Sequence, residues 1–280
     1  MKKIIAPIMT AISVVGLSAG LLTNYIANKS EYLKPKDGIE ITKDLKMIAH
    51  RGLSSCAPEN SLSAYRLAGE AGFKYAECDI RMTKDNEWVL THDAKLNRVT
   101  DGKGLVSEKT LEEIKALRYK RGANIKLYKD EKIATIREFL QVCTEYGISP
   151  FIEIKSGNEI GFADLIDMLK EFKMLKKAII IDYNVNNLKA IRQLCPELQM
   201  MILCKVVSRK VIAMAEEIGN CGIDVMHTLM MRNKALADVA EKGLSLNCWT
   251  VDRIGTLKKA HKLGAAYVTT NCVKPLQKQE

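Results

Sequence analysis

Five residues of types that can act on a phosphate ester occur close together in a chain that holds only 4 histidines in 280 residues. They are His50, Arg51, Glu77, Asp79 and His92. Hydrolysis of a phosphodiester requires cations near the nonbridging oxygens, together with a proton donor and a proton acceptor in line with the scissile bond. This stretch holds a candidate for each requirement, and it therefore indicates phosphodiester chemistry.

The acidic residues have spacings that place them on shared strand faces. Glu77 and Asp79 alternate with other residues in the run 75–80, and successive strand residues point to opposite faces. Glu153 and Lys155 repeat this spacing in the apolar run 150–156. The pattern predicts that two carboxylates share a face of one strand, and that a third carboxylate and a cation share a face of a second strand, so that together they can form a metal site.

The elements that would carry these residues alternate between short β-rich apolar runs and amphipathic stretches from residue 46 onward. This alternation is typical of βα units around a parallel sheet, and helical periodicity is clear over residues 135–146 and 209–218. Eight strands are predicted, which is the number in a TIM barrel. They begin near Met47, Tyr75, Phe151, Ala178, Met200, Ile223, Leu244 and Ala266.

In a TIM barrel the active site lies at the carboxyl ends of the strands. Several polar or aromatic residues fall at the ends of the predicted strands, and we expect them to converge on one mouth. They are His50, Glu77, Asp79, Glu153, Lys155 and Trp249.

Several motifs together, in order and spacing, resemble the glycerophosphodiester phosphodiesterase family. They are His50-Arg51-Gly52 with Pro58-Glu59-Asn60, the pair Glu77 and Asp79, Thr91-His92-Asp93, and residues 96–104, 136–140 and 152–155. The resemblance covers residues 47–274. It implies an α/β fold, a TIM (β/α)8 barrel with a small insertion at about residues 94–132, between the second and third strands. It also implies metal-dependent hydrolysis of glycerophosphodiesters to sn-glycerol 3-phosphate and an alcohol.

Three carboxylates, those of Glu77, Asp79 and Glu153, are the predicted ligands of one divalent cation. Carboxylate oxygens suit hard cations, so we expect Mg²⁺ or Ca²⁺. Arg51 and Lys155 are expected to bind the phosphate, with Arg51 as the better bidentate clamp. The alternative is that the carboxylates only form salt bridges with these two cations.

The histidines fall into two groups. His50 and His92 match the motifs and are expected to divide the proton transfers, but the sequence leaves open which is the acid and which is the base. His227 and His261 match no motif, and we expect them to be structural. Trp249 is predicted either to form an apolar wall against the glycerol carbons or to fill the core.

Asn271 departs from the family pattern, which often has an aspartate after the last strand. We interpret the change as an altered rim of the pocket. The rival interpretation is a catalytically silent barrel that binds phosphate-bearing ligands.

The N-terminal residues are predicted to lie outside the catalytic domain. Residues 4–22 carry no charge and follow Lys2 and Lys3, and they are long enough to cross a hydrocarbon layer of about 30 Å. We expect residues 1–23 to be a transmembrane signal anchor or a cleaved signal peptide. Residues 24–45 are interpreted as a polar tether, and residues 46–280 as the barrel domain.

Charge and cysteine content bear on location. The positive charge before the apolar segment favours a membrane-anchored protein with an extracytoplasmic catalytic domain, and cleavage would make it secreted. The formal net charge of +10 suits an anionic lipid surface or a phosphate substrate, or solvated helix faces, and no nucleic acid partner is predicted. The 8 cysteines lack Cys-x-x-Cys spacing and are expected to be buried free thiols.

Two further enzymatic interpretations share this fold. A phospholipase of the same superfamily, acting on lyso or intact lipids, would fit an anchor that holds the barrel mouth near a bilayer. A sugar-phosphate aldolase or isomerase is also compatible with the barrel, because fold alone does not fix function. The aldolase or isomerase would not predict two histidines beside three carboxylates.

Overall fold

The structure is a computed structural model that describes residues 33–39, 45–231 and 233–276. The predicted anchor at residues 1–23 and part of the predicted tether lie outside these ranges. Within them, no helix combines the length and the apolar character that crossing a membrane would require.

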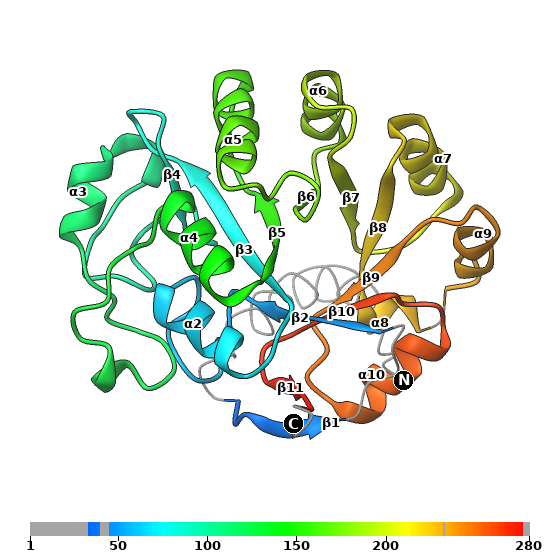
Figure 1. Cartoon of the computed structure of the whole chain (residues 1–280), viewed down its shortest axis with the longest axis horizontal. Coiled ribbons are helices and arrows are strands. Elements are labelled where there is room, and N and C mark those ends of the chain that lie inside the picture. The colour runs from blue at the N-terminus through cyan, green and yellow to red at the C-terminus, as the bar shows by residue number, and fades with distance from the viewer. Residues whose placement is uncertain (1–32, 40–44, 232, 277–280) are drawn as a thin grey trace, which may run out of the picture.

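Eight parallel strands close into a barrel, as the sequence predicts (Figure 1). Their order is β2, β10, β9, β8, β7, β6, β5, β3, and pairing of β2 with β3 closes the ring. Each strand begins within two residues of its predicted start. The strands are β2 (Lys46–His50), β3 (Tyr75–Met82), β5 (Ser149–Ile154), β6 (Ile179–Asp182), β7 (Gln199–Cys204), β8 (Cys221–Met226), β9 (Leu246–Trp249) and β10 (Tyr267–Thr270).

Helices surround this barrel (Figure 1). The sequence predicts α4 and α7 to within one residue, because local signals mark their starts. Thr135 and Glu138 form a capping box at the start of α4, and the Ser208 side chain accepts a hydrogen bond from Val211 N at the start of α7. The helices are α2 (Leu62–Glu70), α4 (Ile136–Tyr146), α5 (Glu159–Glu171), α6 (Val185–Leu194), α7 (Arg209–Ile218), α8 (His227–Met230), α9 (Leu236–Glu241) and α10 (Ile254–Lys262).

Apolar side chains fill the inside of the barrel away from its mouth. Tyr75, Phe151 and Tyr267 contact one another edge to face, with ring centroids 5.2–5.9 Å apart. They pack in one cluster with Ile48 and Ile181. This packed layer closes the barrel, so that a ligand can enter only from the mouth.

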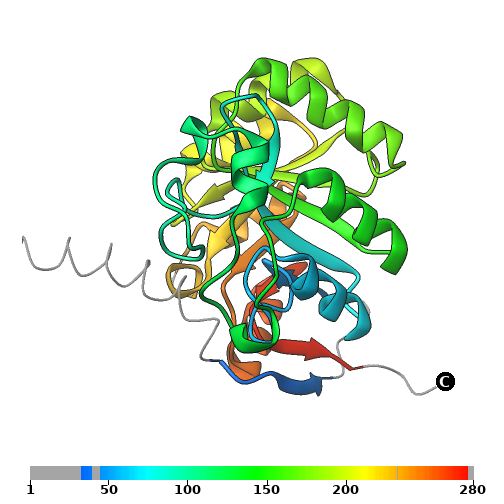
Figure 2. The ribbon, with the colours of Figure 1, turned by 90° about the vertical axis from the view of Figure 1, so that its left-hand side faces the viewer.

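The segment between β3 and β5 forms a small unit with its own apolar core. It contains β4 (Trp88–Leu90), which runs antiparallel to β3, the short helix α3 (Leu111–Ala116), and the 3₁₀ turns η2 (Val106–Glu108) and η3 (Ile125–Leu127). Its core includes Leu96, Ile114 and Tyr119. The unit lies at the left of the barrel in Figure 1 and faces the viewer in Figure 2.

A strand inside the predicted tether joins the barrel domain. Strand β1 (Lys36–Ile39) pairs in parallel with β11 (Val273–Pro275), which follows β10. Lys36 N donates to Cys272 O at 2.8 Å, and the Lys36 ammonium contacts Asp252 O. Asp252 and Cys272 follow the carboxyl ends of β9 and β10, so β1 lies at the mouth end of the barrel.

Candidate active site

A cavity of about 240 Å³ lies at the carboxyl ends of the barrel strands. Seven of the eight predicted site residues line it, namely His50, Arg51, Glu77, His92, Glu153, Lys155 and Trp249. The eighth, Asp79, is fully buried and forms ion pairs with Arg51 and Lys155. The structure therefore brings all eight residues to one place.

The turn after β2 places Arg51 among the carboxylates. Arg51 has a φ of 56° and Gly52 a φ of 78°, and a Cβ on Gly52 would lie 2.6 Å from the backbone of Ala64. This turn therefore requires glycine at position 52. It directs Arg51 N toward Glu77 Oε2 at 2.9 Å and Arg51 Nε toward Asp79 Oδ2 at 3.0 Å.

Oxygen atoms of Glu77, Asp79 and Glu153 lie within 4.8 Å of one another. Among the described residues, Glu77 Oε1 and Asp79 Oδ1 have no hydrogen-bond partner although both are buried. Lys155 Nζ lies 2.5 Å from Glu153 Oε1 and 3.3 Å from Asp79 Oδ1. The salt bridges that the sequence allowed as an alternative are therefore present, and they leave Glu77 Oε1 without a partner among the described residues.

The three carboxylates of Glu77, Asp79 and Glu153 outnumber the two cations, Arg51 and Lys155, that contact them. Burial and the neighbouring Asp79 raise the pKa of Glu77 well above its usual range. Burial raises the pKa of Glu153 to about 7, although Lys155 opposes the change. Burial alone would raise the pKa of Asp79, but Arg51 and Lys155 hold it well below its usual range. The donor set and the charge excess both fit a hard divalent cation.

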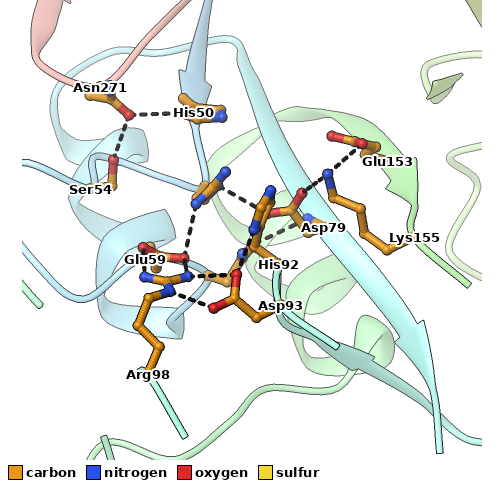
Figure 3. Close-up of polar contacts among 12 residues, drawn as sticks. His50, Ser54, Glu59, Asp79, His92, Asp93, Arg98, Glu153, Lys155 and Asn271 are labelled. Atoms are coloured by element: carbon orange, nitrogen blue, oxygen red, sulfur yellow. Dashed lines mark hydrogen bonds and ion pairs between the residues drawn. The ribbon is translucent and has the colours of Figure 1, made fainter. Parts of the chain in front are cut away.

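His50 is held by the residue that departs from the family pattern. Its Nδ1 lies 2.7 Å from Asn271 Oδ1, which also accepts a hydrogen bond from Ser54 Oγ at 3.1 Å (Figure 3). His50 Nε2 points toward Glu77 Oε2 at 3.9 Å. Burial and the charge of Arg51 lower the pKa of His50 to about 3, so the imidazole is neutral at physiological pH. Asn271 thus supplies the orienting contact through an amide oxygen.

His92 is held by a charged partner instead. Its Nδ1 lies 2.8 Å from Asp93 Oδ1, and Arg98 Nε donates to Asp93 Oδ2 at 2.6 Å (Figure 3). Arg98 also bonds Glu59 through both terminal nitrogens, at 2.6 and 2.9 Å. Burial would raise the pKa of Glu59, but Arg51 and Arg98 lower it to about 2.

Arg98 and Glu59 link the two halves of the site, and the sequence did not reveal this role. Glu59 accepts from Arg51 NH1 at 2.9 Å as well as from Arg98, so it connects the residue beside His50 with the partner of Asp93. Both residues lie within the family motifs, but motif membership alone does not specify a partner 39 positions away. The only signal in the sequence was that Glu59 and Arg98 carry opposite charges and lie within motifs of the site.

The rest of the cavity is formed by β6 to β9 and is largely apolar. Ile181, Leu203 and Met226 line it, and the rings of Tyr183 and Trp249 meet at 90° with centroids 6.4 Å apart. Trp249 therefore lines the cavity, and its contact with the glycerol carbons stays a prediction.

One histidine outside the motifs also reaches this cavity. His227, which the sequence assigned a structural role, lines the wall, and its Nδ1 lies 3.3 Å from Trp249 O. It lies in α8, directly after β8.

Comparisons with known proteins agree with this geometry. A family model described as "Glycerophosphoryl diester phosphodiesterase family" matches residues 50–274. The glycerophosphodiester phosphodiesterase of Caldanaerobacter subterraneus is 31% identical over 235 residues, which cover 80% of this chain and 93% of that protein. Glycerophosphodiester phosphodiesterase 1 of Homo sapiens is 38% identical over 148 residues, 52% of this chain and 42% of that protein.

A solved structure extends the similarity to the fold. An Oleispira antarctica phosphodiesterase, in complex with the product sn-glycerol-3-phosphate, superposes with a TM-score of 0.74 at 27% identity. The match covers 81% of this chain and 92% of that chain.

Proposed function

Because this chain belongs to the glycerophosphodiester phosphodiesterase family, we propose that it hydrolyses glycerophosphodiesters to sn-glycerol 3-phosphate and an alcohol. One observation carries the proposal, namely that two histidines, two cations and three carboxylates meet at a single cavity. The product bound to the related Oleispira antarctica enzyme supports the same substrate class. A silent binding barrel would have no use for two oriented histidines.

The metal requirement follows from the carboxylates. Glu77, Asp79 and Glu153 would hold one Mg²⁺ or Ca²⁺ ion, which supplies Lewis-acid polarisation of the phosphoryl group when bound. Lys155 and Arg51 neutralise charge on the phosphate from the side of the carboxylates. Arg51 is already bonded to Glu59 and Asp79, so it acts as a fixed positive charge.

The partners of the two histidines suggest their roles. His50 faces the neutral amide of Asn271 and starts unprotonated, so we assign it as the base that accepts the proton of the nucleophile. His92 faces the carboxylate of Asp93, which opposes the lowering of the His92 pKa by burial and by Arg51, so we assign it as the acid that protonates the leaving alcohol.

The leaving group tests this assignment. An alcohol such as choline needs protonation to depart, whereas a nitrophenolate does not. His92→Ala should therefore lose about 10³-fold in rate with glycerophosphocholine and much less with a nitrophenyl ester, while His50→Ala should lose similar factors with both. Equal losses for His92→Ala on the two substrates would contradict the assignment.

The reaction itself is tested with the purified full-length protein. We expect glycerol 3-phosphate release to stop with a chelator, to return with Mg²⁺ or Ca²⁺, and to be lost in Glu153→Gln. His261→Ala is the matched control, because His261 lies in α10, outside the residues that line the cavity. Undiminished release by a chelated, folded enzyme would refute the metal requirement.

A second candidate substrate is a lysophospholipid, the alternative that the predicted anchor raised. Four apolar side chains are 42–73% exposed in segments that follow successive strands β5 to β8 at the mouth, namely Ile160, Tyr183, Val206 and Leu229. An acyl chain leaving the cavity would find apolar contacts there. Val206→Ser combined with Leu229→Ser should slow hydrolysis of lysophosphatidylcholine and spare glycerophosphocholine.

We also propose that residues 1–23 anchor the protein at a membrane, with the catalytic domain outside the cytoplasm. The uncharged run 4–22 and the entry of the chain at the mouth end through β1 support this proposal. Fractionation of cells that express the full chain, followed by protease treatment of intact cells, tests it. Recovery of a shortened chain in the medium would favour secretion after cleavage.

A further inference from the structure

The wall formed by β6 to β9 holds a buried carboxyl group that the proposed reaction does not use. Asp224 lies on β8, is 1% exposed, and lines the cavity. In the part of the chain that the structure describes, its Oδ1 has no hydrogen-bond partner. An unpaired buried polar atom destabilises the site, so a ligand atom that pairs with Asp224 Oδ1 would recover this cost.

A row of polar groups continues from Asp224 across the neighbouring strands. Asn247 on β9 is its partner in the strand register. Asn247 Nδ2 donates to Thr269 Oγ1 on β10 at 2.9 Å, and Thr269 also lines the cavity. All three residues are at most 3% exposed, whereas Tyr183 at the rim is 46% exposed. Asp224 and Thr269 therefore line the deep end of the cavity, and Asn247 is bonded to Thr269.

A second unpaired atom lies on the same wall. Trp249 follows Asn247 by two residues on β9, and its Nε1 has no hydrogen-bond partner within the described residues. Asp224 and Trp249 are diagonal neighbours across β8 and β9, since Asp224 pairs with Asn247 and Met226 pairs with Trp249. Met226 and Leu203 supply apolar surface beside them.

The polar atoms of Asp224 and Trp249 can pair with adjacent hydroxyl groups, and the apolar side chains of Met226 and Leu203 can contact the carbon atoms that carry them. We propose that Asp224 and Trp249 bind the hydroxyl groups of the glycerol moiety, so that the deep end of the cavity selects a vicinal diol. The inference rests on the proposed function, because glycerol is the part that all glycerophosphodiesters share. The variable alcohol then lies toward the open mouth, where substrates of different size can be accommodated.

The charge of the site favours a hydroxyl over an ammonium group. Burial raises the pKa of Asp224 well above its usual range, the Asn247 side chain opposes this only in part, and the charge of Glu153 adds to it. A protonated carboxyl can donate a hydrogen bond to a hydroxyl oxygen, and an amide in its place could do the same. A ligand ammonium would instead need the ionised carboxylate.

Binding of two phosphate monoesters to the full-length protein tests the inference by calorimetry. The ligands are sn-glycerol 3-phosphate and n-propyl phosphate, which lacks both hydroxyls. We expect the wild-type protein to bind the glycerol ester at least about tenfold more tightly, Asp224→Leu to bind the two alike, and Asp224→Asn to keep most of the preference. If Asp224→Leu does not fold, Asp224→Ala serves the same purpose.

A matched control uses another buried aspartate at a strand end. Asp182 on β6 accepts hydrogen bonds from Asn184 N and Asn187 Nδ2, and it is not among the residues that line the cavity. Asp182→Asn should leave the ligand preference unchanged even if it lowers stability. Loss of the preference in this control would show that any buried aspartate has the same effect, and it would overturn the inference.

Other outcomes separate this inference from the proposed function. A hydrolytically active wild-type protein that binds both esters equally, or an Asp224→Leu variant that keeps the preference, overturns the inference alone. Weakened binding of phosphocholine, but not of glycerol 3-phosphate, in Asp224→Asn would mean that Asp224 binds an ammonium group, which also overturns it. Absence of hydrolysis by the wild-type protein would instead refute the proposed function.

Discussion

The two walls of the cavity are built from different chemistry. On the wall from β2, β3 and β5, charged side chains are locked together by ion pairs, such as those of Arg51 with Glu59 and Asp79. On the wall from β6 to β9, apolar side chains such as Leu203 and Met226 share the lining with polar ones, and buried polar atoms of Asp224 and Trp249 have no partner among the described residues. The first wall is preorganised to act on a phosphate, whereas the second still offers groups that a ligand can pair with.

This difference predicts that changes in the two walls will have different kinetic effects. A preorganised ion-pair network acts on the charge that develops in the transition state, so a change there should lower kcat. A wall that contacts the unreactive part of the substrate should mainly affect KM.

Among the changes that compare the two walls, the largest effect is expected from Lys155→Met. This change removes the cation that contacts Asp79 and Glu153, so we expect kcat to fall by about 10²-fold or more. Lys205→Met is the control, because Lys205 lines the other wall and is exposed. Steady-state kinetics should show less than about a threefold change for Lys205→Met, and equal losses in the two variants would break the distinction between the walls.

The next effect concerns stability and its dependence on pH. Arg51 and Arg98 outweigh burial and lower the pKa of Glu59 from 4.5 to about 2, so ionised Glu59 stabilises the fold by about 3 kcal/mol. This contribution is complete above pH 4.5 and is lost as the pH falls toward 2. We expect Glu59→Gln to lower the free energy of unfolding at pH 7 and to weaken its decline in acid, as measured by urea titrations at pH 7 and pH 3.5.

An exposed ion pair provides the comparison for Glu59. Glu171 pairs with Arg137 at the surface, where solvent screens the charges, so Glu171→Gln should change stability little. If Glu59→Gln and Glu171→Gln were equally stable, the buried ion pairs of Glu59 would stabilise the fold no more than a surface ion pair does.

A smaller effect is expected where the charged wall meets the last strand. Asn271→Ala removes the oxygen that orients His50 Nδ1, and we expect kcat to fall by about tenfold. Ser54→Ala removes a donor to the same oxygen and leaves the contact with His50, so its kcat should stay close to that of the wild type. A wild-type rate in Asn271→Ala would show that packing alone orients the ring.

The smallest effect is expected from Trp249→Phe. The ring that contacts Tyr183 is largely kept, but the Nε1 donor is lost. We expect KM to rise by about threefold to tenfold with kcat nearly unchanged. A lower kcat with unchanged KM would contradict this, because it would mean that Trp249 acts on the transition state, as the charged wall does.

The sequence predicts strands and their ends well because the signals are local. Apolar runs define the eight strands, and the alternation of Glu77 with Asp79 places both on one face. Contacts between loops carry no such signal, so the sequence did not predict the links from Glu59 to Arg98 or from Asn271 to His50. Asp224 was visible as a single charge in the apolar run 221–226, but it matched no motif.

The contact between His50 and Asn271 also determines when this chain can become active during its synthesis. The two residues are 221 positions apart, and strand β2, which carries His50, pairs with β10, which is made after all the other strands of the barrel. The ring and its orienting amide therefore meet only after the chain has been synthesised beyond β10. A nascent chain can hold every other predicted site residue and still lack an aligned base, which would delay catalysis until the barrel closes.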